Sequence, residues 1–364
     1  LSMQRMAAVL DIDVEAQSVH AQAGIFGPDL EAALKPRGLA VRHFPQSYFH
    51  STLGGWAATR GAGHFSTQFA KIEDRVQALR VVTGDGRIAE TQRLPAGSVG
   101  VDPNRLWCGS EGTLGVIVGA TLKLTPIPPG TVATIGAYFS SIDDAAAASA
   151  AITAARLRPA VMELVDELAL ASILLHLGLA ARAPGSAYLL VQTDGDAAEN
   201  EARAALAIID QHGGTAGMTT DRIEGESMLA VRRAMHPAME ALGNVLIEDV
   251  AVPRSRLAEM FAAIRVIGER HGIAIPTVAH AGDGNLHPNL VYTGDEVPDT
   301  VWIAAGELFE AALALGGTLT GEHGIGTLKR RWLADELGEP QVALQQSIKA
   351  AFDPRGILNP GKVF

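Results

Sequence analysis

The chain has 364 residues, of which 29 are Lys or Arg and 40 are Asp or Glu, so its formal net charge is −11. Hydrophobic residues make up 48% and charged residues 19%, the composition of an ordinary soluble globular protein that is long enough for two domains. The acidic balance and the lack of a basic run argue against a nucleic-acid partner. The longest apolar stretch, residues 168–181, predicts a buried helix, because a membrane-spanning helix needs about 20 residues. We therefore expect no integral membrane segment.

The first third of the chain has the pattern of short strands joined by glycine turns. β-branched runs at residues 19–23, 79–83 and 116–124 predict strands, and helical patterns are sparse. The proline-rich segment 126–130 then predicts a domain boundary, because proline interrupts both helices and central strands. We expect the first domain to cover residues 1–127.

The rest of the chain alternates between strand and helix patterns. Strands are predicted at residues 132–139, 160–165, 188–193, 245–252, 273–279 and 286–292. Helices are predicted at residues 141–156, 197–212, 224–242, 254–272 and 301–315. This order predicts an α+β fold in which an antiparallel sheet is covered by helices. We expect this cap domain to cover residues 128–320, and a C-terminal segment, residues 321–364, to follow it.

Residues 280–289 predict a hairpin that carries polar chemistry on one face. Asp283-Gly284 between two strand patterns is typical of a two-residue turn. The numbers of opposite residues then sum to 567, which pairs His280 with His287 at a Cβ separation of about 4.5–5.5 Å. That separation suits two imidazoles that share a metal ion.

Side-chain alternation places Asn289 on the face of His287, and Leu286 and Leu290 on the other face. The alternative is that the two histidines are capping or surface residues in a chain that has eleven. A matched pair that flanks a turn favours metal ligation.

A divalent ion bound by two imidazoles needs a further, anionic ligand. Glu322 and His323 lie between glycines in residues 317–326, where the backbone can approach a ligand closely. Glu322 could complete a metal site, and His323, with an ordinary pKa of about 6.5, could accept a proton. A solvated loop at the start of a helix near Ile325 is an equally open interpretation.

Three segments of the first domain are rich in small residues, namely 50–55, 58–63 and 109–117. Their backbone N–H groups could surround a large flat or phosphorylated ligand, although glycines in such loops more often only make turns. None of them matches a dinucleotide fingerprint or a Walker sequence, which disfavours a nicotinamide-binding Rossmann domain.

Together these segments resemble the FAD-linked oxidases and dehydrogenases of the vanillyl-alcohol oxidase type, over nearly the whole chain. The resemblance is carried by residues 51–56, 71–74, 109–117 and 352–362. It implies a FAD-binding PCMH-type domain followed by a cap domain and a C-terminal segment that returns to the FAD domain. The glycine-rich pyrophosphate loop of the family precedes the segment at which this chain opens, so we expect the FAD domain to be N-terminally incomplete.

The resemblance also implies that residues 46–52, 58–61 and 111–117 line the FAD. The expected FAD-binding residues are Ser51, Thr52, Gly54, Gly55, Ala58, Thr59, Arg60, Gly61, Glu111, Gly112, Thr113, Gly115, Val116, Ile117 and Asn359.

Within the family, residues 56–60 look like the alkylglycerone-phosphate synthases. The hairpin and residues 321–324 look like the D-2-hydroxy-acid dehydrogenases, which include D-lactate dehydrogenase and the glycolate oxidase catalytic subunit. This second branch implies a divalent metal of the Zn, Mn or Fe class held by His280, His287 and Glu322, with His323 as the catalytic base. We therefore expect metal-assisted oxidation of a small D-2-hydroxy acid, of the lactate or glycolate class, to the 2-oxo acid with hydride transfer to flavin N5.

Arg232 is expected to bind the substrate carboxylate, since a planar guanidinium matches it bidentately, and Asn289 to contact the substrate. Without the family resemblance, Arg232 reads equally well as a solvated helix arginine beside Arg233. Ile247 stands where relatives that bind a longer diacid have a lysine, which argues against a second substrate carboxylate.

Two other functions stay open. An alkylglycerone-phosphate synthase-like flavoenzyme would need neither the histidine pair nor a metal, and a non-catalytic chain without the flavin loop would serve as a subunit of a full-length partner. For the dehydrogenase we expect an electron acceptor, either a small molecule or a protein, and a homo-oligomer or a partner subunit. The single cysteine, Cys108, cannot form an internal disulfide, so we expect a cytoplasmic protein that an acceptor could hold at a membrane surface.

Overall fold

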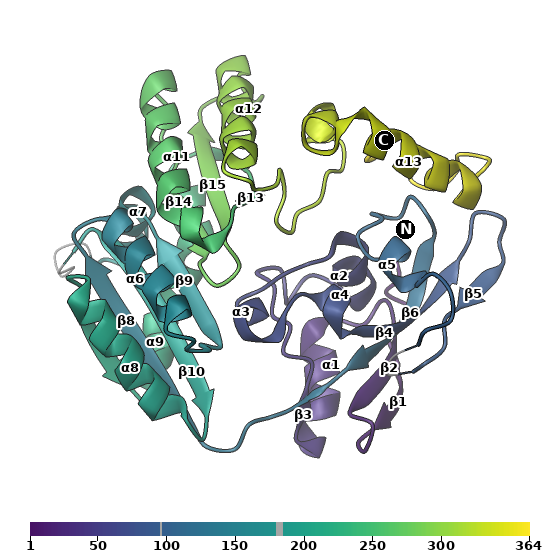
Figure 1. Ribbon diagram of the computed structural model, residues 1–364, viewed down its shortest axis with the longest axis horizontal. Coiled ribbons are helices and arrows are strands. Elements are labelled where there is room, and N and C mark those ends of the chain that lie inside the picture. The colour runs from purple at the N-terminus through teal and green to yellow at the C-terminus, as the bar shows by residue number, and fades with distance from the viewer. Residues whose placement is uncertain (95–96, 180–184) are drawn as a thin grey trace. The chain divides into compact units, whose positions relative to one another are not determined.

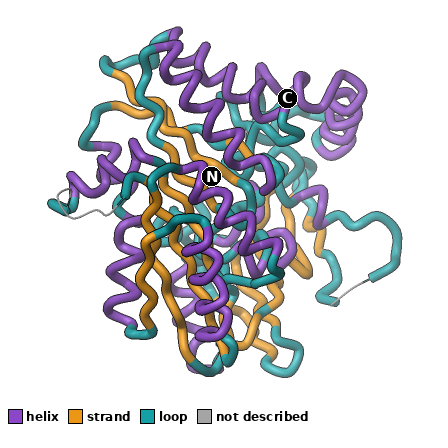
Figure 2. Tube along the Cα trace, turned by 60° about the vertical axis from the view of Figure 1, so that its left-hand side comes forward, coloured by secondary structure: helices purple, strands orange, loops and turns teal. Residues whose placement is uncertain are grey.

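The computed structural model describes residues 1–94, 97–179 and 185–364, which form two compact units. Unit 1 comprises Leu1–Phe65, Phe69–Ile127 and Glu322–Phe364, and unit 2 comprises Ser66–Gln68 and Pro128–Gly321. Each unit combines helices with antiparallel strands (Figures 1 and 2), which confirms the predicted α+β fold class.

Unit 1 is built on a five-stranded antiparallel sheet with the strand order β1-β2-β6-β4-β5. The strands are β1 (Val9–Asp13), β2 (Ser18–Gln22), β4 (Val76–Val82), β5 (Ile88–Glu90) and β6 (Val116–Lys123), and the short strands β3 (Leu39–Ala40) and β7 (Thr125–Pro126) pair separately. The helices are α1 (Gly27–Leu34), α2 (Leu53–Thr59), α4 (Ile72–Arg75), α5 (Asn104–Trp107) and α13 (Leu333–Phe352), and α3 (Ser66–Phe69) begins in unit 2. Apolar side chains of the strands and of α2, such as Val19, Leu122 and Leu53, form its core. The three strands predicted in this part of the chain correspond to β2, β4 and β6.

The C-terminal segment of unit 1 is held by one lysine. The Nζ of Lys349 in α13 donates to the carbonyl oxygens of Thr113 and Leu358, at 2.8 Å each, and contacts the carboxylate of Asp353. Because Thr113 lies just before β6 and Leu358 lies after α13, this lysine joins α13 and the residues after it to the segment that precedes β6.

Unit 2 contains an eight-stranded antiparallel sheet with the path β11-β8-β10-β9-β14-β15-β12, to which β13 adds by pairing with β15. The strands are β8 (Thr131–Phe139), β9 (Val161–Val165), β10 (Ala187–Gly195), β11 (Thr215–Thr219), β12 (Asn244–Ile247), β13 (Val250–Ala251), β14 (Thr277–His280) and β15 (Asn285–Tyr292). The helices are α6 (Ile142–Ala154), α7 (Glu167–His176), α8 (Ala198–Gln211), α9 (Arg222–Arg233), α10 (Met235–Glu240), α11 (Leu257–His271) and α12 (Asp299–Ala314).

The two faces of the unit 2 sheet carry different helices (Figure 1). Phe139 at the end of β8 points to one face. Its ring and the side chain of Ile209 in α8 both lie close to Gly214, so this is the face that α6 and α8 cover. Gly136 points to the opposite face, where a Cβ on it would lie 3.4 Å from the Cγ of Met228 in α9. Alternation along β8 thus separates the two layers, and a residue without a side chain lets α9 approach the sheet.

Several predicted boundaries in unit 2 were wrong. The helix predicted at 224–242 is two helices, α9 and α10, that meet at Ala234, so that Pro237 lies in the first turn of α10, where its missing N–H costs least. The strand predicted at 245–252 is interrupted by Glu248 and Asp249, whose side chains are buried. The edge strand β11 was not predicted, because Gly217 weakens its pattern.

The predicted apolar helix at 168–181 corresponds to α7, which ends at His176, and residues 180–181 lie outside the described residues. One face of α7 is exposed, with Leu175 at 71%, so it is not the fully buried helix that was predicted. No helix in the described ranges is both long and apolar enough to cross a bilayer.

Asp166 connects three elements of unit 2. Its carboxylate accepts hydrogen bonds from the backbone N–H of Ala169 in α7, at 2.8 Å, and of Thr277 in β14, at 2.9 Å. Burial raises the pKa of Asp166 to about 7, although these two N–H groups oppose the shift. Between pH 4 and 7 the folded protein therefore keeps a proton that the unfolded chain has lost.

We predict that the contribution of Asp166 to the free energy of unfolding falls as the pH rises from 4 to 7, by up to about 1.4 kcal/mol per pH unit. Asp166→Asn cannot titrate there. Urea denaturation at a series of pH values should show the wild-type free energy of unfolding declining from pH 4 to 7 relative to that of the variant, and levelling off above pH 7. A difference that stays constant with pH would contradict the assignment.

Candidate functional site

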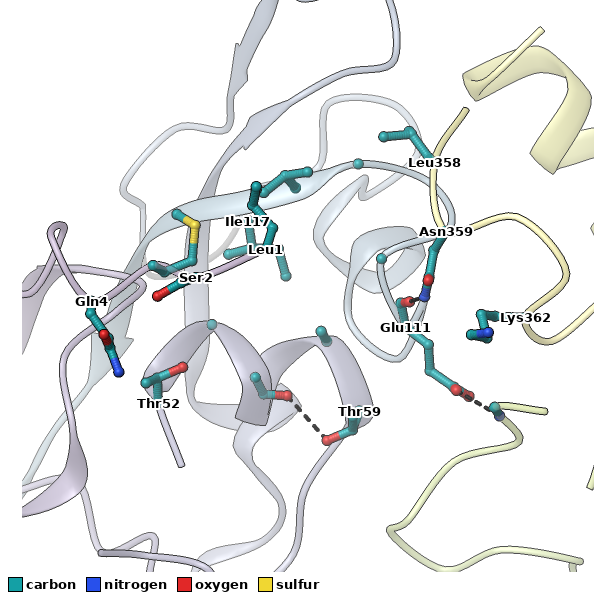
Figure 3. A pocket seen from close by; sticks show the side chains of 18 of the residues that line it. Leu1, Ser2, Gln4, Thr52, Thr59, Glu111, Ile117, Leu358, Asn359 and Lys362 are labelled. Carbon is teal, nitrogen blue, oxygen red and sulfur yellow. Dashed lines mark hydrogen bonds between the residues drawn. The ribbon is translucent and has the colours of Figure 1, made fainter. Parts of the chain in front are cut away.

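Unit 1 contains a cavity of about 780 Å³ beside α2 and β6 (Figure 3). A volume of this size is typical of a site for a cofactor or a small ligand. Of the residues predicted to bind FAD, those that line the cavity are Thr52, Gly54, Gly55, Ala58, Thr59, Glu111, Gly112, Gly115, Val116, Ile117 and Asn359. All three segments that are rich in small residues, 50–55, 58–63 and 109–117, therefore meet the C-terminal run at one place.

Four of the predicted FAD-binding residues do not line this cavity. Ser51 accepts a hydrogen bond from the indole N–H of Trp56, and Arg60 forms an ion pair with Glu73 at 2.9 Å. Gly61 lies beside His43, and Thr113 is buried, with its hydroxyl donating to the carbonyl oxygen of Ser110. Each of them supports the loops that form the cavity wall.

The sequence-based prediction missed several wall residues, namely Leu1, Ser2, Met3, Gln4, Phe26, Gly326, Ile357, Leu358 and Lys362, whereas His50 lies inside the predicted range 46–52. The resemblance had implied that the C-terminal segment returns to the FAD domain, and of its residues only Asn359 had been named as an FAD contact.

Glu111 joins the cavity to the segment that carries Glu322 and His323. Its carboxylate accepts hydrogen bonds from the backbone N–H groups of Ile325 and Gly326, at 2.7 Å each. Gly324 and Gly326 both have positive φ, at +84° and +52°. The positive φ values are incompatible with a right-handed helix, so the helix expected near Ile325 does not form there, and α13 starts only at Leu333.

In unit 2 the predicted hairpin is formed by β14 and β15, but its register is not the predicted one. The numbers of opposite residues sum to 565, so that Val278 lies opposite His287 and His280 opposite Asn285. The predicted two-residue turn needs a positive φ at both Asp283 and Gly284, and of these two only Gly284 has one. The strands are therefore connected by four residues, 281–284.

His280 and His287 nevertheless lie on one face of the hairpin. The sum of the paired residue numbers is 565 in the structure and 567 in the prediction. A difference of two leaves each side chain on its predicted face, because side chains alternate between the faces with a period of two. The two rings are diagonal neighbours with centroids 5.1 Å apart, and a ring nitrogen of one lies within 4.8 Å of a ring nitrogen of the other. Two ligands about 2 Å from one zinc ion are separated by roughly 3 to 4 Å, so a small adjustment of the rings would suffice.

Asn289 shares this face, and its amide nitrogen donates to the carbonyl oxygens of Pro276 and His287. Leu286 and Leu290 are fully buried on the other face, as predicted. The hairpin therefore separates polar from apolar side chains.

The sheet register places a further residue, Glu163, beside His280. Glu163 of β9 pairs directly with His280, and its Oε1 lies 2.6 Å from the Nδ1 of that histidine. Its Oε2 accepts a hydrogen bond from the Nε of Arg232 in α9, at 2.8 Å. Arg232 is 3% exposed, so it is not a solvated helix arginine.

Glu163 was not predicted from the sequence. A single carboxylate in the apolar run of β9 was nevertheless a usable signal, because a charge is buried only with partners. A second buried acid, Asp249, accepts hydrogen bonds from the amide of Asn285, at 3.1 Å, and from the hydroxyl of Thr320, at 2.8 Å. It also accepts one from the backbone N–H of Gly321, and so fixes the end of unit 2 against the start of β15.

Glu322 and His323 open the third segment of unit 1. The backbone N–H of Ala62 donates to the Oε2 of Glu322 at 3.0 Å. This contact joins the segment to the loop that follows α2, which is one of the glycine-rich loops of the sequence analysis.

Comparisons with known proteins match both parts of the chain. Residues 1–92 match the family described as FAD binding domain, and residues 128–363 match the family described as FAD linked oxidases, C-terminal domain. The chain is 36% identical over its whole length to the glycolate oxidase subunit GlcD of Bacillus subtilis, of which it covers 79%. It is also 31% identical to a mitochondrial cytochrome-linked D-lactate dehydrogenase of Arabidopsis thaliana, of which it covers 65%.

Among solved structures, an alkyldihydroxyacetonephosphate synthase superposes with a TM-score of 0.74 at 23% identity, over 99% of this chain and 67% of that one. At this identity the likeness concerns the fold alone. The matches to the two sequence families span both units, and the predicted resemblance is confirmed: the chain belongs to the FAD-linked oxidases, a family of oxidoreductases.

Proposed function

We propose that this protein oxidises a small D-2-hydroxy acid, of the lactate or glycolate class, to the corresponding 2-oxo acid with FAD as its cofactor and a divalent metal ion as its Lewis acid. The observation that carries the proposal is the polar face of unit 2, where two imidazoles, a carboxylate and a guanidinium lie together. The names of the relatives, a glycolate oxidase subunit and a D-lactate dehydrogenase, support the substrate class.

The cavity of unit 1 fits the FAD. Its wall includes glycines of α2 and of the loop before β6, and a Cβ on Gly55 would meet only the hydroxyl of Thr52, at 3.7 Å, so that the backbone is open to a ligand. We assign FAD contacts to the predicted residues that line the cavity.

The metal ligands that we propose are His280, His287 and Glu322. The hydrogen bond from Nδ1 of His280 to Glu163 leaves its Nε2 to bind an ion, and His287 is its neighbour on the same face. Glu322 directly follows Gly321. The backbone N–H of Gly321 donates to Asp249, and Gly321 lies against Asn285 of β15. The metal would lower the pKa of the substrate hydroxyl, and the flavin would accept the hydride from Cα.

The side chains of the protein would bind and orient the acid. Arg232 would bind the substrate carboxylate through its Nη groups, since its Nε already donates to Glu163. His323 would take the hydroxyl proton, and Asn289, which stands beside His287, would contact the substrate.

The direct test is a steady-state assay of the full-length protein with D- and L-2-hydroxy acids and a dye as electron acceptor. We expect turnover of short D-acids and little or none of their L-enantiomers or of diacids. Lack of turnover with every acid, in protein that holds both flavin and metal, would remove the proposal.

His323→Ala should lower kcat by two or more orders of magnitude, roughly the contribution of a general base, while leaving the metal content unchanged. His236→Ala is the matched control, because His236 is an exposed residue of α10 that pairs only with Glu240 among the contacts found. Turnover that persists in His323→Ala would require another base.

Gly55→Leu should lower the flavin content, because the new side chain would extend into the cavity without meeting the backbone. The same substitution at Gly97, which has open space around it and lines no part of the cavity, is the control. Flavin absorbance per protein measures the outcome, and equal flavin content in the two variants would place the cofactor elsewhere.

A further inference from the structure

Glu163 is a fully buried acid on the polar face of unit 2. It has no exposed surface, and its neighbours along β9 are the apolar residues Met162 and Leu164. Both of its carboxylate oxygens are used, one by the ring of His280 and one by the guanidinium of Arg232. Because a buried carboxylate is expensive without such partners, these three side chains depend on one another.

We propose that Glu163 is a positioning residue that orients the imidazole of His280 as a metal ligand and the guanidinium of Arg232 as a carboxylate clamp. The inference rests on the proposed function, because that function gives His280 and Arg232 their tasks. One side chain would then set the distance and angle between the imidazole that would hold the metal ion and the guanidinium that would hold the substrate carboxylate.

The direction of the first hydrogen bond follows from the second. The guanidinium of Arg232 stays charged, so its partner Glu163 is ionised and can only accept hydrogen bonds. The Nδ1 of His280 must therefore carry the proton and donate it to Oε1 at 2.6 Å. That tautomer leaves the lone pair on Nε2, the nitrogen on the far side of the ring from Glu163, to face an ion.

The position of Arg232 depends on close packing between α9 and the sheet. A Cβ on Gly225 of α9 would lie 2.9 Å from the hydroxyl oxygen of Thr134 in β8, and Gly136 in the same strand faces Met228. Two residues without side chains thus let α9 lie near the strands, which brings the Nε of Arg232 to 2.8 Å from Glu163. A lysine at this position would offer no second, separately directed nitrogen for the substrate.

The test is Glu163→Gln in the full-length protein, with Zn²⁺ affinity measured by competition with a chromophoric chelator. We expect the affinity to fall 10- to 100-fold, the usual effect of removing the hydrogen-bond partner of a metal-bound histidine. We also expect KM for the hydroxy acid to rise, because Arg232 loses its anchor. Asp166→Asn is the matched control: Asp166 is a buried acid just beyond β9 that contacts neither His280 nor Arg232, so both quantities should stay near the wild-type values.

Glu163→Gln leaves Arg232 as a buried charge without its carboxylate, which could unfold the protein. A second variant therefore removes both charges. Glu163→Gln with Arg232→Met makes the pair neutral, and its Zn²⁺ affinity should be lowered as in the single variant. Wild-type affinity in either folded variant would overturn the role of Glu163 while leaving the proposed function intact. Wild-type protein that binds no Zn²⁺ at its histidine pair would overturn both.

Discussion

The pairing register of the unit 2 sheet is the constraint on which the polar face depends. Gly136 pairs with Leu190, Leu190 with Glu163, Glu163 with His280, and His280 with Asn285. Directly opposite residues share a face, so this row crosses five strands and brings together residues that are up to 149 positions apart, from 136 to 285. A shift of any one strand by a single residue would turn its members of the row to the apolar face.

Glu163 and His280 of this row are buried, as is Arg232 of α9, and burial strengthens the interactions between them. The acid, the imidazole and the guanidinium form hydrogen bonds inside the protein, where such bonds are stronger than in water and an unpaired charge is costly. The same rule applies to Asp249, which is surrounded by donors at the point where the chain leaves unit 2. Both acids therefore fix backbone and side chains in one arrangement.

Unit 1 uses charged side chains in a similar way to join distant parts of the chain. Two anchors hold the C-terminal segment: Glu111 binds two of its backbone N–H groups, and Lys349 within it binds the carbonyl oxygens of Thr113 and Leu358. Glu111 also lines the cavity, whose wall combines the first four residues of the sequence, residues of α2 and β6, and residues of the C-terminal segment. Loss of either anchor would release the C-terminal wall.

Local pattern was enough to predict much of this fold. Strand runs such as 116–124, the helix that became α6, and the face shared by His280 and His287 all follow from the period of apolar residues. The hairpin register did not, because the turn conformation depends on Val252, whose carbonyl oxygen would lie 2.0 Å from a Cβ on Gly284. Glu163 was missed for a related reason: its partners come from β14 and α9, and sequence spacing carries no information about a contact between three separate elements.

The most direct measurement of the central claim is X-ray absorption spectroscopy of the metal in the full-length protein. We expect two imidazole ligands together with oxygen ligands, and the loss of one imidazole contribution in His280→Ala and in His287→Ala separately. A metal spectrum without imidazole scattering, or one that neither substitution changes, would contradict it.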